Sequence, residues 1–202
     1  MGGLSALVRK MKKVIVLHRV HVLRGPIGEP PPLPDPRHQL SLHIATDPDD
    51  EVLRRSLPAK RLPYAKECLS RGDRAYLAFA GGELAGWSFI ALRSHRDPST
   101  GLRIRLDPGD AYSYDSWVNS TFRDRGVFRF LFGNAYIDLR ANGLASTMVG
   151  YVLGSNEAAF RASAPFGLSR VQEVSIVQVM GRWGAQVPFS ERPRRGPVSR
   201  KG

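Results

Sequence analysis

The sequence predicts an α/β domain in which a mixed, twisted β-sheet is flanked by helices. Residues 112–118 are rich in β-forming residue types, residues 126–141 repeat apolar side chains at helical spacing, and residues 144–153 again favour a strand. A strand, a helix and a strand in this order form a right-handed parallel crossover. Upstream, Gly81-Gly82 separates two apolar runs, which is typical of a tight antiparallel hairpin. A chain of 202 residues with 42% hydrophobic content can build one such core.

Residues 1–24 are interpreted as a basic amphipathic arm, because they hold six basic side chains and no acidic one. Its apolar helical face consists of Leu4, Leu7, Val8, Met11 and Ile15, and residues 14–23 are rich in β-formers. Two uses remain open. The arm can lie on an anionic membrane surface, or it can pack on its own domain or on a second subunit of a homodimer.

Residues 25–37 are expected to be a linker, since their six prolines remove amide donors and favour an extended chain. We therefore place a boundary near residue 38 and assign residues 38–190 to the catalytic domain. The basic residues 191–202 are expected to be a disordered tail.

Between the linker and the crossover, proline and glycine divide the chain into short elements. Thr46 or Asp47 can cap a helical region that Pro58 and Pro63 interrupt and that ends near Gly72. The expected elements are a strand at 40–45, two short helices between 46 and 72, and hairpin strands at 76–80 and 83–92. The charged residues 93–110 are expected to form a loop and the start of the next strand.

The turn between residues 118 and 128 is predicted to bind a diphosphate. The first amides of a helix have no intrahelical acceptor, and the helix dipole makes that end positive. Arg123 and Arg125 flank this helix start and add side-chain donors. The amides from Arg125 to Phe128 are the expected phosphate contacts. The helix should end at Asn142-Gly143, which is a good left-handed cap.

The region resembles the acyl-CoA-binding core of the GCN5-related N-acetyltransferase (GNAT) superfamily. Family members have a strand ending in Val-x-Pro, then Arg/Gln-x-x-Gly-x-Gly/Ala at a helix start, and later an Asn and a Gly-Phe pair. The matching positions here are Val118, Arg123, Gly126, Phe128, Asn156 and Phe166-Gly167-Leu168. The resemblance covers most of residues 40–182.

The resemblance implies that acetyl-CoA is the co-substrate and that two parallel strands splay apart to form the acyl-CoA cleft. The implied cofactor-binding residues are Trp117, Val118, Arg123, Arg125, Gly126, Val127, Phe128 and Asn156. Phe128 departs from the small residue that is usual in the family. Because it continues the apolar stripe of the helix, its ring should turn into the core and leave its amide available.

The resemblance further implies direct transfer of an acetyl group to a primary amine in a ternary complex. The family's usual proton donor, a Tyr, is replaced by Ser163, and a common Glu is replaced by Tyr151. Asp115 is the best carboxylate on the central strand. The catalytic residues are therefore predicted to be Asp115, Tyr114 and Tyr151, with Tyr112 as a further phenol. The alternative is that Asp115 stabilises a loop and that the tyrosines only pack.

Net charge does not point to nucleic acid, because residues 1–24 and 191–202 supply ten of the twelve units of net positive charge. The tail also lacks the aromatic residues that bind single strands. The acceptor is expected to be a small-molecule or peptide amine. The remaining alternatives are a longer-chain or O-acyltransferase acting at a membrane or on a glycan, an acyl-CoA-binding protein without turnover, and a nucleic-acid-associated protein.

A single cysteine, Cys68, excludes an intramolecular disulfide and agrees with a cytoplasmic location. The five histidines are scattered without metal-ligand spacing, so no metal is predicted. No apolar run approaches the ~20 residues of a membrane span. The chain is therefore expected in the cytoplasm, with peripheral membrane contact through residues 1–24 as an open alternative.

Overall fold

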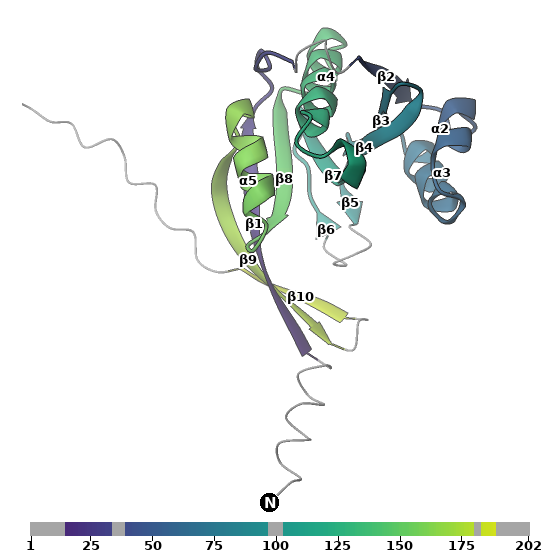
Figure 1. The fold of residues 1–202 in the computed structure, drawn as a ribbon. Helices are drawn as coiled ribbons and strands as arrows, with labels where there is room; N and C mark the ends of the chain where they lie inside the picture. The colour runs from purple at the N-terminus through teal and green to yellow at the C-terminus, as the bar shows by residue number, and fades with distance from the viewer. Residues whose placement is uncertain (1–14, 34–38, 97–102, 180–182, 189–202) are drawn as a thin grey trace, which may run out of the picture.

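The computed structural model describes residues 15–33, 39–96, 103–179 and 183–188, which contain an eight-stranded mixed sheet and a separate two-stranded one (Figure 1). The strand order of the large sheet is β10-β9-β1-β8-β7-β4-β3-β2. Its strands are β1 (Ile15–Pro26), β2 (Leu40–Ala45), β3 (Arg74–Ala80), β4 (Glu83–Ala91), β7 (Asp110–Val118), β8 (Thr147–Leu153), β9 (Ser169–Val179) and β10 (Trp183–Pro188). Only β7 and β8 pair in parallel among these described strands. The predicted fold class is confirmed.

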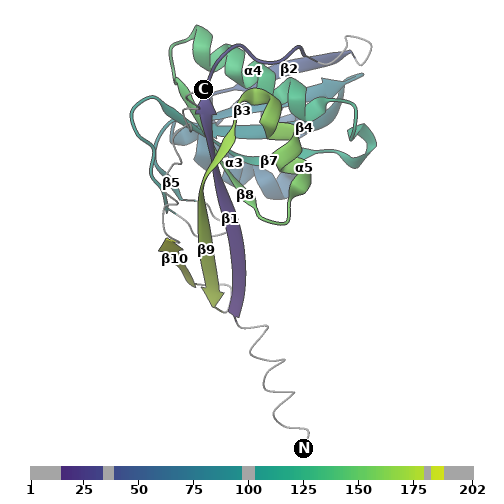
Figure 2. The same ribbon diagram turned by 90° about the vertical axis from the view of Figure 1, so that its left-hand side faces the viewer.

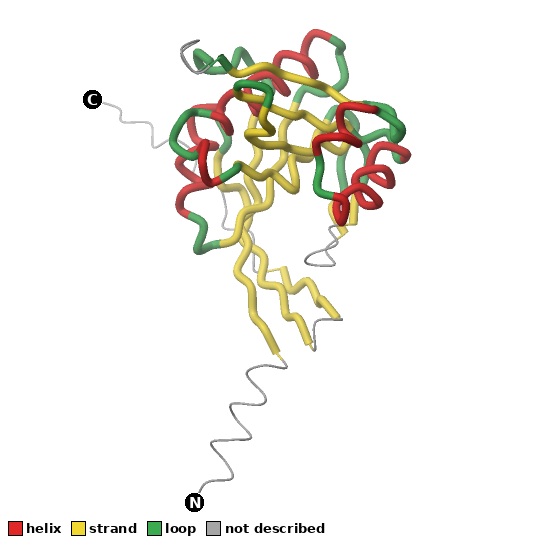
Figure 3. The backbone as a smooth tube through the Cα atoms, turned by 45° about the vertical axis from the view of Figure 1, so that its right-hand side comes forward, coloured by secondary structure: helices red, strands yellow, loops and turns green. Residues whose placement is uncertain are grey.

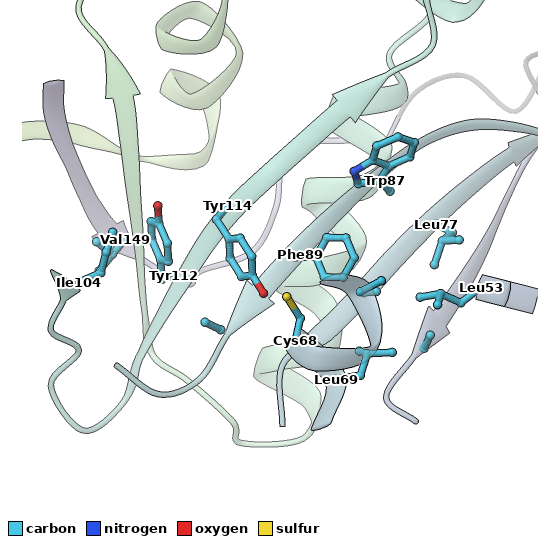
Figure 4. Close-up of a cluster of buried hydrophobic side chains, with 14 of the residues drawn as sticks. Leu53, Cys68, Leu69, Leu77, Trp87, Phe89, Ile104, Tyr112, Tyr114 and Val149 are labelled. Atoms are coloured by element: carbon cyan, nitrogen blue, oxygen red, sulfur yellow. The ribbon is translucent and has the colours of Figure 1, made fainter. Parts of the chain in front are cut away.

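Helices cover both faces of the large sheet (Figures 1 and 2). They are α2 (Glu51–Ser56), η2 (Ala59–Arg61), α3 (Leu62–Ser70), η3 (Ser120–Phe122), α4 (Val127–Ala141), α5 (Glu157–Ser163) and η4 (Ala164–Phe166). Leu53 of α2 and Leu69 of α3 are buried against Leu77 and Phe89 on one face (Figure 4). Leu131 and Phe132 of α4 are buried on the other face. The sheet is therefore the middle layer of three.

Upstream of the crossover, the helices and hairpin strands are those predicted, but some of their first and last residues differ from the prediction. Asp50, rather than Thr46 or Asp47, caps α2, because its Oδ1 accepts a 2.7 Å hydrogen bond from the Leu53 amide. Gly81 and Gly82 have φ values of +58° and +84°, as a primed hairpin turn requires. The loop expected over residues 93–110 contains the small strands β5 (His95–Arg96) and β6 (Arg103–Ile104).

β1 corrects the predicted boundary near residue 38. It lies inside the sheet, antiparallel to both β8 and β9, and Val20 and Leu23 are buried in the core. Arg24 donates 2.9 and 2.8 Å hydrogen bonds to Asp110, whose side chain is only 3% exposed. This β-rich segment pairs with β8 and β9, which follow it in the sequence by more than 120 residues. From residue 15 the predicted arm is therefore part of the sheet, whereas residues 1–14 lie outside the described residues.

The described part of the predicted linker lies against the domain. The Ile27 amide donates a 2.8 Å hydrogen bond to the Ser146 carbonyl, and the Ile27 side chain is buried. Leu33 contacts α4 so closely that a Cβ added at Gly133 would lie 2.5 Å from Leu33 Cδ2. This segment is not a free spacer, because its apolar residues pack on the helix. Residues 34–38 and the predicted tail, 191–202, lie outside the described residues.

At one end of the molecule, β1, β9 and β10 extend beyond the helices as a three-stranded ribbon (Figure 3). The pairs Ile15–Val179 and Trp183–Val179 show that β9 lies between β1 and β10 in this ribbon. The candidate site lies elsewhere, in the middle of the sheet where β7 and β8 meet.

Candidate active site

The parallel strands β7 and β8 pair over only four positions and then part. Their register runs from Asp110 opposite Thr147 to Ser113 opposite Gly150. β7 continues to Val118 without further pairs to β8. The remaining backbone groups on this side of β7 are therefore not used by the parallel ladder, and the two strands splay as predicted (Figure 1).

A β-bulge in β7 lies immediately after the last parallel pair. Tyr114 is opposite Phe89 and Trp117 is opposite Trp87, so two residues of β7 face the one residue between them on β4. One of the two, Asp115, has a φ of +48°, a left-handed conformation that few residues other than glycine adopt. A bulge bends its strand and increases the local twist. This explains why β7 leaves β8 at this point.

The bulge also directs Asp115 toward α2 and α3. Simple alternation would place Asp115 on the opposite face from Tyr112 and Tyr114, which are buried on the α2/α3 side. Instead, Nη2 of Arg61, at the end of η2, donates a hydrogen bond to Oδ1 of Asp115. The carboxylate that the sequence places on the central strand therefore faces the α2/α3 side of the sheet.

The start of α4 has the geometry expected of a phosphate site. Gly126 caps the helix with a φ of +76° and a ψ of 11°, and Asp124 is also left-handed, at a φ of +61°. The first intrahelical bond runs from the Phe130 amide to the Gly126 carbonyl, at 2.9 Å. Among the described residues, we find no acceptor for the amides from Arg125 to Phe128.

The side chains of this turn divide between core and solvent. Val127 is buried, and the Phe128 ring stacks on Phe132 with centroids 5.2 Å apart. The prediction that the Phe128 ring turns into the core is therefore confirmed. Arg123 and Arg125 are exposed, and the guanidinium carbon of Arg125 lies 5.8 Å from the Phe122 ring centroid. Backbone amides and guanidinium groups are thus available together.

Solved structures of GNAT proteins share the fold of this chain. The chain has the GNAT fold. A putative acetyltransferase of the GNAT family from Novosphingobium aromaticivorans matches at a TM-score of 0.56 and 18% identity, over 82% of this chain and 65% of that one. A GCN5-related N-acetyltransferase from Kribbella flavida matches at 0.53 and 12% identity, over 88% and 64%.

A tandem GNAT protein from the clavulanic acid biosynthesis pathway matches at a TM-score of 0.56 and 19% identity, over 95% of this chain and 60% of that one. The chain thus spans about three fifths to two thirds of these GNAT chains. No family model matches the amino-acid sequence, and no curated protein matches it.

Within the GNAT fold, the predicted catalytic residues have different surroundings. The Tyr114 hydroxyl donates a 2.6 Å hydrogen bond to the buried Asp73 carboxylate, and burial together with Asp73 raises the pKa of Tyr114. Tyr151 is half-buried just after the last β8 pair, and its ring lies edge-on to Tyr112 at 5.6 Å. Burial raises the pKa of Tyr151 as well. The structure therefore places Tyr114 in the core and Tyr151 at the point where the strands part.

The residues near the carboxyl end of the GNAT core are already engaged in local bonds. Asn156 caps α5, and its Oδ1 accepts a 3.1 Å hydrogen bond from the Ala159 amide. Ser163, at the position of the family's proton donor, donates a 2.8 Å hydrogen bond to the Ala159 carbonyl and is buried. Its hydroxyl stabilises the helix in this structure.

The structure adds residues to the site that sequence reasoning missed. The guanidinium carbon of Arg61 lies 5.5 Å from the Trp87 ring centroid and 5.8 Å from that of Tyr64. Trp87 stacks on Trp117 with centroids 4.3 Å apart and an interplanar angle of 23°. Arg61 and Asp115 are 54 residues apart, so no local pattern could have linked them.

The described residues contain no group of three or more His, Cys, Asp and Glu side chains placed to hold a metal ion. None of the helices described is both long enough and apolar enough to cross a membrane.

Proposed function

We propose that the protein is an N-acyltransferase that transfers acetyl from acetyl-CoA to a primary amine. The observation that carries this proposal is the coincidence of two features in a GNAT fold. The parallel strands β7 and β8 part at the Asp115 bulge. Through the short η3 turn, β7 then leads to the start of α4, whose first amides have no acceptor among the described residues.

The residues present fit acetyl-CoA. The amides from Arg125 to Phe128, with the Arg123 and Arg125 side chains, would hold its diphosphate. The backbone of β7 beyond Ser113, including Trp117 and Val118, would accept the pantetheine arm as an added strand. When bound, acetyl-CoA supplies an activated thioester.

The chain's own residues would position the acceptor and move protons. Asp115 is the carboxylate placed to take a proton from the amine, and Arg61 orients it through their hydrogen bond. Tyr151, half-buried next to Tyr112 where β7 and β8 part, is the phenol that would give a proton to the leaving group. Alignment of two reactants in one site contributes to the rate independently of these proton transfers.

An acyl-CoA-binding protein without turnover is the second candidate, because Ser163 is bonded to Ala159 at the position of the family's proton donor. The two candidates share the same binding site. They differ in whether amines cause thiol release from acetyl-CoA.

Titration calorimetry with acetyl-CoA and CoA tests the binding site. We expect both to bind, and we expect Gly126→Asp to weaken binding by about 100-fold, because a Cβ would strain a left-handed position and a carboxylate would repel the diphosphate. Gly143→Asp is the matched control. Gly143 is also left-handed, with a φ of +61°, and it follows the other end of α4.

Folded protein that gives no binding heat with either ligand at millimolar concentration would contradict the proposal. Equal losses in Gly126→Asp and Gly143→Asp would place the diphosphate elsewhere. Binding without thiol release, over a broad panel of amines, would favour the second candidate.

A further inference from the structure

An ion pair lies where β7 parts from β8. Nη2 of Arg61 donates to Oδ1 of Asp115, and their side chains are 35% and 23% exposed. The pair is therefore neither sealed in the core nor fully solvated. It joins the η2 turn to the bulge of β7, and both charged side chains are partly exposed to solvent.

Aromatic rings hold the guanidinium in place. Arg61 lies over Trp87 and beside Tyr64, at distances that allow cation–π contact with both rings. Trp117 stacks on Trp87 and is 37% exposed. An opposite-charge pair therefore lies beside an aromatic surface that solvent reaches.

The cluster contains a buried hydrogen-bond donor. The indole Nε1 of Trp87 is buried and makes no hydrogen bond within the described part of the chain. Indole and guanidinium groups donate and never accept. Oxygen atoms of a ligand, above all those of a carboxylate, are the natural complement.

We propose that the acceptor is a zwitterionic amino carboxylate with an aromatic or apolar side chain. Its ammonium would bind Asp115, its carboxylate would bind Arg61, and its side chain would lie against Trp117. A protein ion pair is complementary to a zwitterion, because each charge of the ligand meets the opposite charge of the pair. A simple cationic amine would instead meet Arg61 with no charge to balance it.

This inference rests on the proposed acyl transfer and names its substrate class. In the reaction, Asp115 takes one proton from the ammonium and releases it to solvent. The neutral amine then forms a C–N bond to the acyl carbon as the C–S bond breaks, and the second proton lost by nitrogen ends on the thiolate sulfur. The products are an N-acyl amino acid and a free thiol.

Matched acceptors test the assignment. Thiol release from acetyl-CoA would be measured with L-phenylalanine, L-phenylalaninamide and phenethylamine. We expect kcat/KM for the amino acid to exceed that for each of the other two by about 100-fold, since both lack the charge that pairs with Arg61. Equal values for the three, or a preference for phenethylamine, would overturn the proposal and leave acyl transfer intact.

Substitutions of Arg61 test whether this residue causes the preference for the amino acid over its amide. Arg61→Gln should bring the ratio of amino acid to amide toward one, and Arg61→Lys should restore part of it. The control is Lys60→Ala, because Lys60 is the exposed basic neighbour on the same turn and should leave the ratio unchanged. A ratio unaffected by Arg61→Gln in folded protein would show that Arg61 is only structural.

A binding measurement decides the question even if no acyl transfer is found. Titration of L-phenylalanine should change the tryptophan fluorescence of the wild-type protein, and L-phenylalaninamide should bind about 100-fold more weakly. Selective binding in a protein that does not bind acetyl-CoA would sustain this inference and contradict the proposed function. Absence of binding at millimolar L-phenylalanine would contradict the inference itself.

Discussion

Asp115 and the nearby tyrosines differ in what each side chain contacts. We therefore expect substitutions at some of these residues to lower turnover and at others to lower stability. Asp115 and Tyr151 lie where the strands part, whereas the Tyr114 hydroxyl bonds to buried Asp73. We expect Asp115→Asn to lower turnover by ~100-fold or more, as loss of a general base does. Tyr151→Phe should also slow turnover. Ser163→Ala should do much less, because Ser163 bonds to a helix carbonyl.

Tyr114→Phe provides the structural comparison for these variants. It would remove the shorter hydrogen bond of the buried Asp73, the 2.6 Å bond from Tyr114, and leave the 3.3 Å bond from Arg71. The free energy of unfolding should therefore fall by about 1–3 kcal/mol. Turnover per folded molecule should stay near the wild-type value. Denaturant unfolding and the thiol-release assay measure the two effects separately, and full turnover in a folded Asp115→Asn protein would make Asp115 structural too.

At the scale of elements, the orientation of α2 depends on its cap. The Asp50 carboxyl accepts from the Leu53 amide, and its Oδ2 lies 2.8 Å from His43 Nε2. Partial burial opposes ionisation, but these two bonds outweigh it and lower the pKa of Asp50 below its ordinary value. The stabilisation is therefore present above the ordinary carboxyl pKa and is lost as pH falls through the lowered one.

Asp50→Ala should lower the free energy of unfolding by about 1 kcal/mol at pH 7, the usual value of an N-cap. The difference from wild type should shrink below about pH 4, where the carboxyl becomes protonated. Urea unfolding at several pH values measures it. Asp47→Ala is the control, because the Asp47 carboxylate accepts from the Asp49 amide in the turn before α2 and does not cap the helix. A difference that grows toward acid pH would contradict this account.

At the scale of the whole molecule, β1 joins the amino-terminal segment to the far side of the sheet. It fills the position between β8 and β9, and Arg24 pairs with Asp110 at the start of β7. Deleting residues 1–26 would remove β1, which pairs with both β8 and β9. It would also remove Arg24, the cation that pairs with Asp110. We expect that chain to show no cooperative unfolding transition, whereas one starting at residue 15 should unfold cooperatively.

Circular dichroism during thermal unfolding compares the two chains, and a cooperative transition without residues 1–26 would show that β1 is dispensable. The same comparison sharpens the proposal of membrane contact. Co-sedimentation with anionic vesicles should be tested with the chain that starts at residue 15, because a chain starting at Arg37 would lack β1 as well as the basic segment before it.

Local patterns were sufficient to predict much of this protein. The helical period of residues 126–141, the Gly81-Gly82 turn and the basic turn before α4 each depend on interactions within a few residues. The sequence by itself therefore predicted the parallel crossover, its splay through the family resemblance, and a helix that starts at the basic turn; the binding of a diphosphate there stays a prediction. What only the tertiary structure decided lies between distant segments: the position of β1, the docking of Leu33 on α4, and the pairing of Arg61 with Asp115. Contacts between segments this far apart in the sequence depend on which surfaces pack best together, and no short-range pattern records that choice.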